Sequence, residues 1–159
     1  MITAVDSSVI LDVLTGDPGN ASLSLAALRK ASLEGRLIVG ESVIAEVRPV
    51  FESNALFEEF LGDWGLEFMP STLGSSIRAG EMLRNMLARK RRQEGRILPD
   101  FLIGAHALEH ADRLLARDRG FLRDYFTELA LWDPSRSPLA AARARWKCRD
   151  CRRYTSQSD

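Results

Sequence analysis

Residues 2–12, ITAVDSSVILD, carry the clearest signal of the fold. The first four residues of this stretch are mostly apolar or β-branched, and they predict a short strand. Asp6 ends this strand, and Ser7 or Ser8 can cap a short helix that we expect over residues 9–14. A strand that passes directly into a helix begins a β–α unit, so this stretch indicates an α/β domain.

The same alternation of strands and helices continues along the chain. Short apolar runs predict further strands over residues 37–39, 66–69, 113–116 and 129–132. Helical spacing, capping residues and glycine stops predict helices between Asn20 and Gly35 and over residues 42–51, 55–64, 71–94, 100–111 and 119–126. This order predicts an α/β domain built on a central parallel sheet of about five strands, with right-handed crossovers.

Length and composition bound the class of protein. The chain has 159 residues, of which 45% are hydrophobic and 28% charged, and its formal net charge is zero. These values are typical of one globular domain and exclude a disordered chain or a disulfide scaffold. No apolar run approaches the roughly 20 residues that a membrane span needs. The first residues lack the basic region of a secretory signal, so we expect a cytoplasmic protein with no membrane partner.

The charge is unevenly distributed. Residues 84–96 contain six Lys or Arg against one Glu, and residues 139–159 contain six against two Asp. We expect residues 1–134 to form the folded domain and residues 135–159 to be a flexible, basic C-terminal extension. A single Cys-x-x-Cys pair lies in this extension, and zinc sites normally need two such pairs or added His.

One basic run within residues 84–96 is a candidate for contact with RNA phosphates. The same run is also typical of a solvated helix end, where basic side chains favour the helix dipole. Its members are Arg89, Lys90, Arg91 and Arg92.

Two acidic side chains stand where parallel sheets bind ligands, beyond the carboxyl ends of strands, and two more are candidates to join them. Asp6 follows the first predicted strand, and Asp118 follows the fourth. Asp100 stands at a predicted helix start, and Glu46 interrupts an apolar helix one turn after Ser42. Converging carboxylates repel each other and stay ionised when a cation neutralises them. Hard oxygen ligands select Mg²⁺ or Mn²⁺, so the sequence predicts a site for one of these ions.

Each of these acids also has a purely structural interpretation. Asp6 suits a turn after a strand, Asp100 and Asp118 suit helix caps, and Glu46 suits a solvated helix position. Asp12 lies six residues after Asp6 on a helix that can turn away, and we expect it at the surface.

The chain contains four motifs that, in this order, resemble the PIN domain family and most closely its VapC-type toxins of toxin–antitoxin pairs. They are DSSVILD at residues 6–12, AEV at 45–47, LPDFLIGAHA at 98–107 and LLARDRGF at 114–121. Any one motif is weak, but the four in order are specific. The resemblance covers about residues 1–134.

The resemblance implies an α/β/α sandwich and a Mg²⁺- or Mn²⁺-dependent endoribonuclease in which a metal-activated water hydrolyses RNA. It also implies a cognate antitoxin protein that blocks the site, and a homodimer. By position, the acidic quartet is Asp6, Glu46, Asp100 and Asp118. Asp6, Asp100 and Asp118 are then the expected metal ligands, and Ser7 is the supporting hydroxyl. Ala116 departs from the family, because many members carry Thr or Ser there, and a hydrogen bond that orients Asp118 is then missing.

Three other kinds of protein compete with this interpretation. A PIN-like domain that binds RNA or a partner without cutting is compatible with Ala116. A signalling receiver needs an adjacent acidic pair near the end of the first strand and a Lys after a late strand, and the sequence supplies neither. A haloacid-type phosphatase needs a second Asp at position 8, where the chain has Ser8.

Overall fold

The structure is a computed structural model that describes residues 1–88, 97–118 and 120–136. The candidate RNA-contacting run at residues 89–92 and the part of the predicted extension beyond residue 136 lie outside the described residues.

Five parallel strands form one sheet in the order β3-β2-β1-β4-β5. They are β1 (Ile2–Val5), β2 (Arg36–Val39), β3 (Leu66–Phe68), β4 (Arg113–Leu115) and β5 (Leu131–Trp132). The central strand is β1, in which Thr3 pairs with Leu37 of β2 on one side and with Arg113 of β4 on the other. The prediction of an α/β domain on a five-stranded parallel sheet is therefore confirmed.

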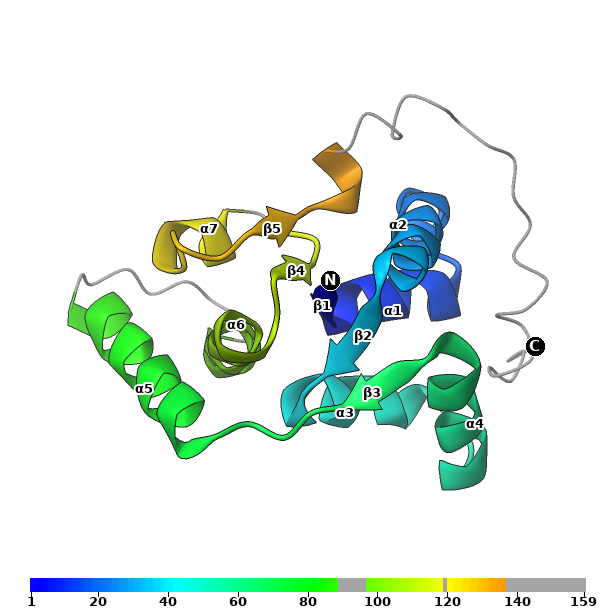
Figure 1. The fold of residues 1–159 in the computed structure, drawn as a ribbon, viewed down its shortest axis with the longest axis horizontal. Coiled ribbons are helices and arrows are strands. Elements are labelled where there is room, and N and C mark those ends of the chain that lie inside the picture. Colours follow the sequence, from blue (N-terminus) through cyan, green and yellow to red (C-terminus); the bar gives the residue numbers. More distant parts are fainter. Residues whose placement is uncertain (89–96, 119, 137–159) are drawn as a thin grey trace.

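Helices cover both faces of the sheet. They are α1 (Ser7–Thr15), α2 (Ala21–Glu34), α3 (Glu41–Val47), α4 (Asn54–Trp64), α5 (Leu73–Ala88), α6 (Ile97–His110) and α7 (Phe121–Tyr125), with short 3₁₀ turns η1 (Arg48–Val50) and η2 (Pro134–Arg136). Figure 1 shows α1 and α2 together on one side of the sheet and α5 and α6 together on the other. Helix α3 contacts both α1 and α6. This is the expected α/β/α sandwich.

Two prolines explain where two of the helices, α3 and α6, differ from the prediction. The helix expected over residues 42–51 ends at Val47, and Pro49 lies in the 3₁₀ turn that follows. Proline has no amide to donate, so the α-helical hydrogen bonding of α3 stops short, although Arg48 before it keeps helical dihedral angles (φ −50°, ψ −40°). Helix α6 begins at Ile97 rather than at Asp100, with Pro99 in its first turn. Amides of a first turn have no partner within the helix, so the proline costs no hydrogen bond there.

The core lies between the sheet and its covering helices. Its largest fully buried side chains include Phe60, Phe101, Leu28 and Ile10. Packing is close where α6 meets Phe126 after α7, because a Cβ added at Gly104 would lie 2.5 Å from the Phe126 ring. Within the described ranges, no helix is both long enough and apolar enough to cross a membrane.

Candidate active site

The candidate site lies at the carboxyl ends of β1 and β4, which are neighbours in the sheet. The Asp6 amide donates to the Leu115 carbonyl at 3.0 Å, which extends the β1–β4 ladder by one residue. Beyond this bond the two chains separate, since Asp6 caps α1 and the β4 chain continues to Asp118. The same end of the sheet therefore carries two of the predicted acids.

Asp6 is a buried carboxylate in the cap of α1. Its Oδ2 accepts hydrogen bonds from the Ser8 amide, at 3.3 Å, and from the Ser8 hydroxyl. Burial raises the pKa of the Asp6 carboxyl above its usual value, and the negative charge of Glu46 adds to the shift, while the bonds from Ser8 oppose it. The Asp6 charge is therefore only partly compensated by the groups around it.

Glu46 reaches this end of the sheet from α3, which starts directly after β2. The Ser7 hydroxyl donates to Glu46 Oε2, so Ser7 joins the start of α1 to α3. Consecutive serines thus donate hydrogen bonds to different acids: Ser7 to Glu46 and Ser8 to Asp6. The structure brings Asp6, Ser7 and Glu46 together.

Asp100 lies in the first turn of α6 and is half-buried. Helix α6 leads into β4 through only residues 111–112, so it runs antiparallel to the strand, and its first turn points toward the strand's carboxyl end. At ~1.5 Å per residue, a helix outreaches a three-residue strand, which places this turn at or beyond the sheet edge. Asp100 therefore belongs to the same end of the fold as Asp6.

Asp118 is buried and held by the start of α7. Its Oδ1 accepts a hydrogen bond from the Leu122 amide at 2.9 Å. Its Oδ2 lies 3.7 Å from Arg123 Nη2 and has no hydrogen-bond partner among the described residues. Ala116 offers no hydroxyl, and the Leu122 amide orients the Asp118 carboxylate. The structural interpretation of Asp118 as a helix cap is thus realised, whatever further role it has.

The donor set fits a hard divalent cation in its chemistry. Asp6 and Glu46 are neighbouring acids whose mutual repulsion a cation would relieve, and Asp118 Oδ2 is a buried oxygen with an unsatisfied lone pair. Within residues 1–88, 97–118 and 120–136, however, no three His, Cys, Asp or Glu side chains gather closely enough to hold a metal ion. The acids share one end of the sheet, but their carboxylates do not converge on one metal position.

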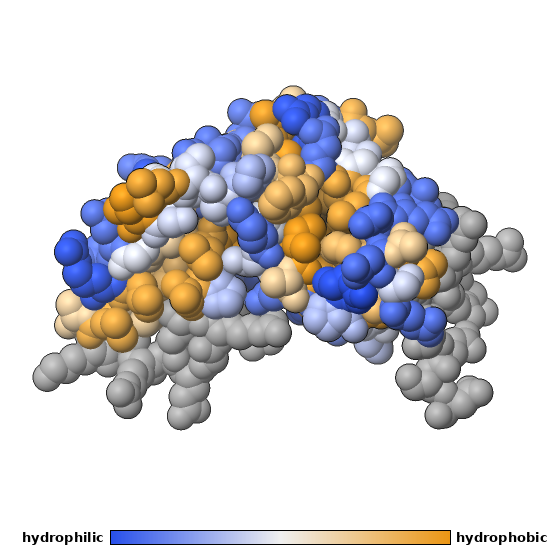
Figure 2. All heavy atoms as spheres, turned by 90° about the horizontal axis from the view of Figure 1, so that it is seen from below, coloured by the Kyte–Doolittle hydropathy of each residue, from blue (hydrophilic) through white to orange (hydrophobic). Residues whose placement is uncertain are grey.

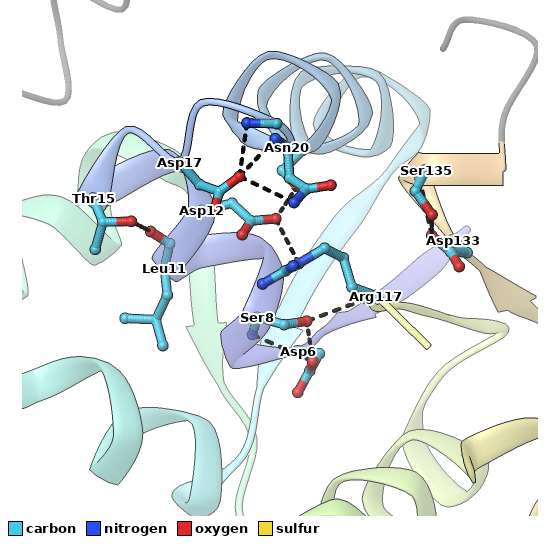
Figure 3. Close-up of polar contacts among 12 residues, drawn as sticks. Asp6, Ser8, Leu11, Asp12, Thr15, Asp17, Asn20, Arg117, Asp133 and Ser135 are labelled. Atoms are coloured by element: carbon cyan, nitrogen blue, oxygen red, sulfur yellow. Dashed lines mark hydrogen bonds and ion pairs between the residues drawn. The ribbon is translucent and has the colours of Figure 1, made fainter. Parts of the chain in front are cut away.

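The expectation that Asp12 lies at the surface is wrong. Asp12 is 2% exposed, and its Oδ2 accepts from the Ser24 hydroxyl at 2.6 Å and pairs with Arg117 Nε at 2.8 Å. Figure 3 shows Arg117 reaching across to Asp12 while its backbone lies beside Ser8 and Asp6. One signal pointed to this burial: α1 is apolar on almost every side, and an acid inside such a helix needs a partner.

Comparison with known proteins identifies the family to which this fold belongs. Residues 3–126, most of the chain, match the PIN domain family. The chain therefore belongs to the PIN domain family. No curated protein sequence matches the chain.

Several solved structures share the fold. VapBC2 from Rickettsia felis, bound to a DNA fragment from their promoter, is 22% identical with a TM-score of 0.62, over 84% of this chain and 98% of that chain. VapBC-1 from nontypeable Haemophilus influenzae is 16% identical with a TM-score of 0.62, over 85% and 99%. FitAcB from Neisseria gonorrhoeae is 18% identical with a TM-score of 0.61, over 86% and 100%. At these identities the likeness establishes the fold.

Proposed function

We propose that this protein is a Mg²⁺- or Mn²⁺-dependent endoribonuclease and the toxin of a toxin–antitoxin pair. The observation that carries the proposal is the buried Asp6 carboxylate, which stands beside Glu46 at the end of the central strand with its pKa raised. Burial and a neighbouring carboxylate make the Asp6 charge costly in the absence of a cation, which is typical of carboxylates that bind a metal ion. Solved structures that share this fold include VapBC complexes.

Each residue of the site has a role in this proposal. Asp6, Asp100 and Asp118 would hold the ion. When bound, the ion supplies a Lewis acid for the scissile phosphate and lowers the pKa of a water molecule. Ser7 fixes the Glu46 carboxylate by donating to Oε2, so that Glu46 can orient the attacking water and accept its proton at a carboxylate oxygen.

RNA is a polyanion, and the acidic site repels it. The positive charge that attracts RNA must therefore come from elsewhere, and the sequence offers residues 84–96 and 139–159. Among the described residues, Arg123 lies beside Asp118 with its side chain 49% exposed. We assign RNA capture to Arg89, Lys90, Arg91 and Arg92 together with the basic C-terminal extension.

The proposed protein partners are an antitoxin and a second copy of this chain. An antitoxin segment with a basic side chain would match the acidic site electrostatically, as Arg123 already does for Asp118 within the chain. For the second copy, α5 exposes three apolar side chains on one face: Leu73, Ile77 and Leu87. Figure 2 shows apolar side chains gathered on this side of the molecule.

The test is cleavage of a labelled single-stranded RNA in millimolar Mn²⁺. We expect wild-type cleavage that EDTA abolishes and that Asp6→Asn removes. Asp17→Asn is a matched control, because Asp17 is also an acid before a helix. Its carboxylate accepts hydrogen bonds from amides of the loop ahead of α2 and is not one of the proposed site residues. Cleavage that survives Asp6→Asn would refute the proposed site.

One observation favours a second candidate function, a catalytically weak PIN-like protein that binds RNA or a partner. The Asp118 side chain is 1% exposed and is already engaged by the Leu122 amide and Arg123. If the wild type bound RNA but left it intact at every Mg²⁺ and Mn²⁺ concentration tested, this candidate would replace the nuclease.

A further inference from the structure

An ion pair between the buried Asp12 carboxylate and the half-buried Arg117 side chain lies directly behind the acidic site. Arg117, the residue before Asp118, extends its side chain from the end of β4 to Asp12 in α1, with Nε 2.8 Å from Oδ2. The Ser24 hydroxyl, fully buried in α2, donates to the same carboxylate at 2.6 Å. The consecutive helices α1 and α2 and the distant chain after β4 therefore meet at Asp12, and Figure 3 shows Arg117 reaching it.

The backbone of Arg117 is attached to the site as well. Its amide donates to the Ser8 hydroxyl at 3.2 Å, and that hydroxyl donates to Asp6 Oδ2. One residue is thus fixed twice: its main chain contacts the hydroxyl that bonds to Asp6, and its side chain contacts Asp12. Asp118 follows immediately in the chain, so its position depends on these two attachments.

The energetics favour a positioning role over a stabilising one. Burial of the Asp12 carboxylate is costly, and its pKa is raised by that burial despite the bond from Ser24 and the charge of Arg117. Apolar side chains of similar volume would serve stability as well or better. What the pair adds is a charge contact that holds Arg117 against α1: its Nε lies 2.8 Å from Asp12 Oδ2, although it makes no aligned hydrogen bond among the described residues.

We propose that Asp12 and Arg117 are positioning residues of the acidic site, holding residues 116–118 against α1 so that Asp118 stays at the strand end that carries Asp6. This inference rests on the proposed function, since it concerns how well the site holds its ion. Groups that support metal ligands from behind typically change metal affinity or activity by ~10–100-fold when removed.

The experiment compares two substitutions that each neutralise the acid partner of an arginine on the β4 chain. Asp12→Asn acts at the carboxyl end of β4. Glu34→Gln acts at the amino end, where Glu34 Oε2 lies 2.5 Å from Arg113 Nη2. Three quantities are measured for each variant: the melting temperature in EDTA, the affinity for Mn²⁺ by electron paramagnetic resonance, and the hydrogen exchange rate of the Arg117 amide by NMR without metal.

We expect Asp12→Asn to weaken Mn²⁺ binding at least tenfold and to speed exchange of the Arg117 amide, whereas Glu34→Gln changes neither. Ser24→Ala keeps the charge of Asp12 and removes its hydrogen bond, so it should shift both quantities in the same direction by less. Ser24→Ala also decides the question if Asp12→Asn fails to fold. RNA cleavage should follow the Mn²⁺ affinity.

Two outcomes would overturn the inference. Wild-type Mn²⁺ affinity and amide exchange in Asp12→Asn, even with a lower melting temperature, would show that the pair is merely structural. Equal losses of affinity in Asp12→Asn and Glu34→Gln would show a general loosening of the fold. A wild-type chain that binds no Mn²⁺ would instead refute the proposed function, and the exchange of the Arg117 amide would still show whether Asp12 fixes this segment.

Discussion

Replacing Asp6 by Asn should change the stability of the protein and its response to metal in opposite directions. Asp6 is buried, and both burial and the neighbouring charge of Glu46 raise its pKa. A raised carboxylate pKa means that the folded state holds the proton more tightly than the unfolded state. The charge therefore costs stability above this pKa, and stability rises as the pH falls toward the ordinary value near 3.8. Without metal, Asp6→Asn should be as stable as the wild type or more stable.

The expected size of the metal effect follows from mass action. An ion present at a hundred times its dissociation constant stabilises the folded state by about 2.7 kcal/mol. For a chain of this size each kcal/mol raises the melting temperature by about 2–4 °C, so the wild type should gain roughly 5–11 °C in saturating Mn²⁺. Asp6→Asn should gain almost nothing, because it removes a charged ligand.

The assay is a thermal melt in EDTA and across a Mn²⁺ series, with two companion variants. Asn caps a helix about as well as Asp, whereas Asp6→Ala should lose about 1 kcal/mol of capping energy as well as the charge, so the difference between the two variants reports the cap. Asp17→Asn should change the metal-free stability in the opposite direction, since the Asn20 amide and other donors hold the pKa of Asp17 below its usual value. It should be less stable without metal and keep the full response to Mn²⁺. A clear loss of metal-free stability in Asp6→Asn would refute the argument, because it would show that the Asp6 charge stabilises the fold.

Three further predictions concern packing, pH and RNA capture. Gly104→Ala should cost about 1–3 kcal/mol in urea unfolding because the new Cβ meets the Phe126 ring, whereas Gly80→Ala, with nothing within 4 Å, should gain up to about 1 kcal/mol. Burial lowers the pKa of His106, so the unfolded state takes up its proton first and stability should fall as the pH drops below about 6.5; chemical unfolding at several pH values should show this slope, and His106→Gln should flatten it. Truncation after Pro138 should weaken RNA binding and flatten its salt dependence, because each phosphate neutralised on a single strand releases about 0.7 counterion; equal slopes for the two proteins would leave the extension without a role in RNA capture.

Much of the fold was predictable because its signals are local. The apolar run at residues 2–5 predicted β1, and Asp6 marked its end, since a short buried strand needs only β-branched or apolar residues and a polar stop. The serines after Asp6 predicted a helix start, which the structure places at Ser7 with Asp6 itself as the cap. Helix α6 was harder to bound, because Pro99 also fits inside a first turn.

The positions of the site residues were predictable in part. Acids after β1 and β4 must share one end of a parallel sheet, so the neighbourhood of Asp6 and Asp118 followed from the strand pattern. Sequence pattern could not show that the Asp118 carboxylate is held by the Leu122 amide and faces Arg123, because those contacts depend on how the chain turns after β4.

The order of strands and helices, the parallel sheet and the placement of acids at strand ends could all be predicted from sequence. The signals for them are local, since each strand or helix is favoured by its own residues and their near neighbours. Which of the two adjacent serines donates to which acid could be learned only from the tertiary structure. The same holds for the burial of Asp12, which the local pattern had placed at the surface. The physical reason is that Ser24 and Arg117, which lie 12 and 105 positions away in the sequence, offset the cost of burying the Asp12 carboxylate. A buried charge depends on its partners: Ser24 reaches Asp12 when α2 packs on α1, and Arg117 reaches it only once β4 has paired with β1.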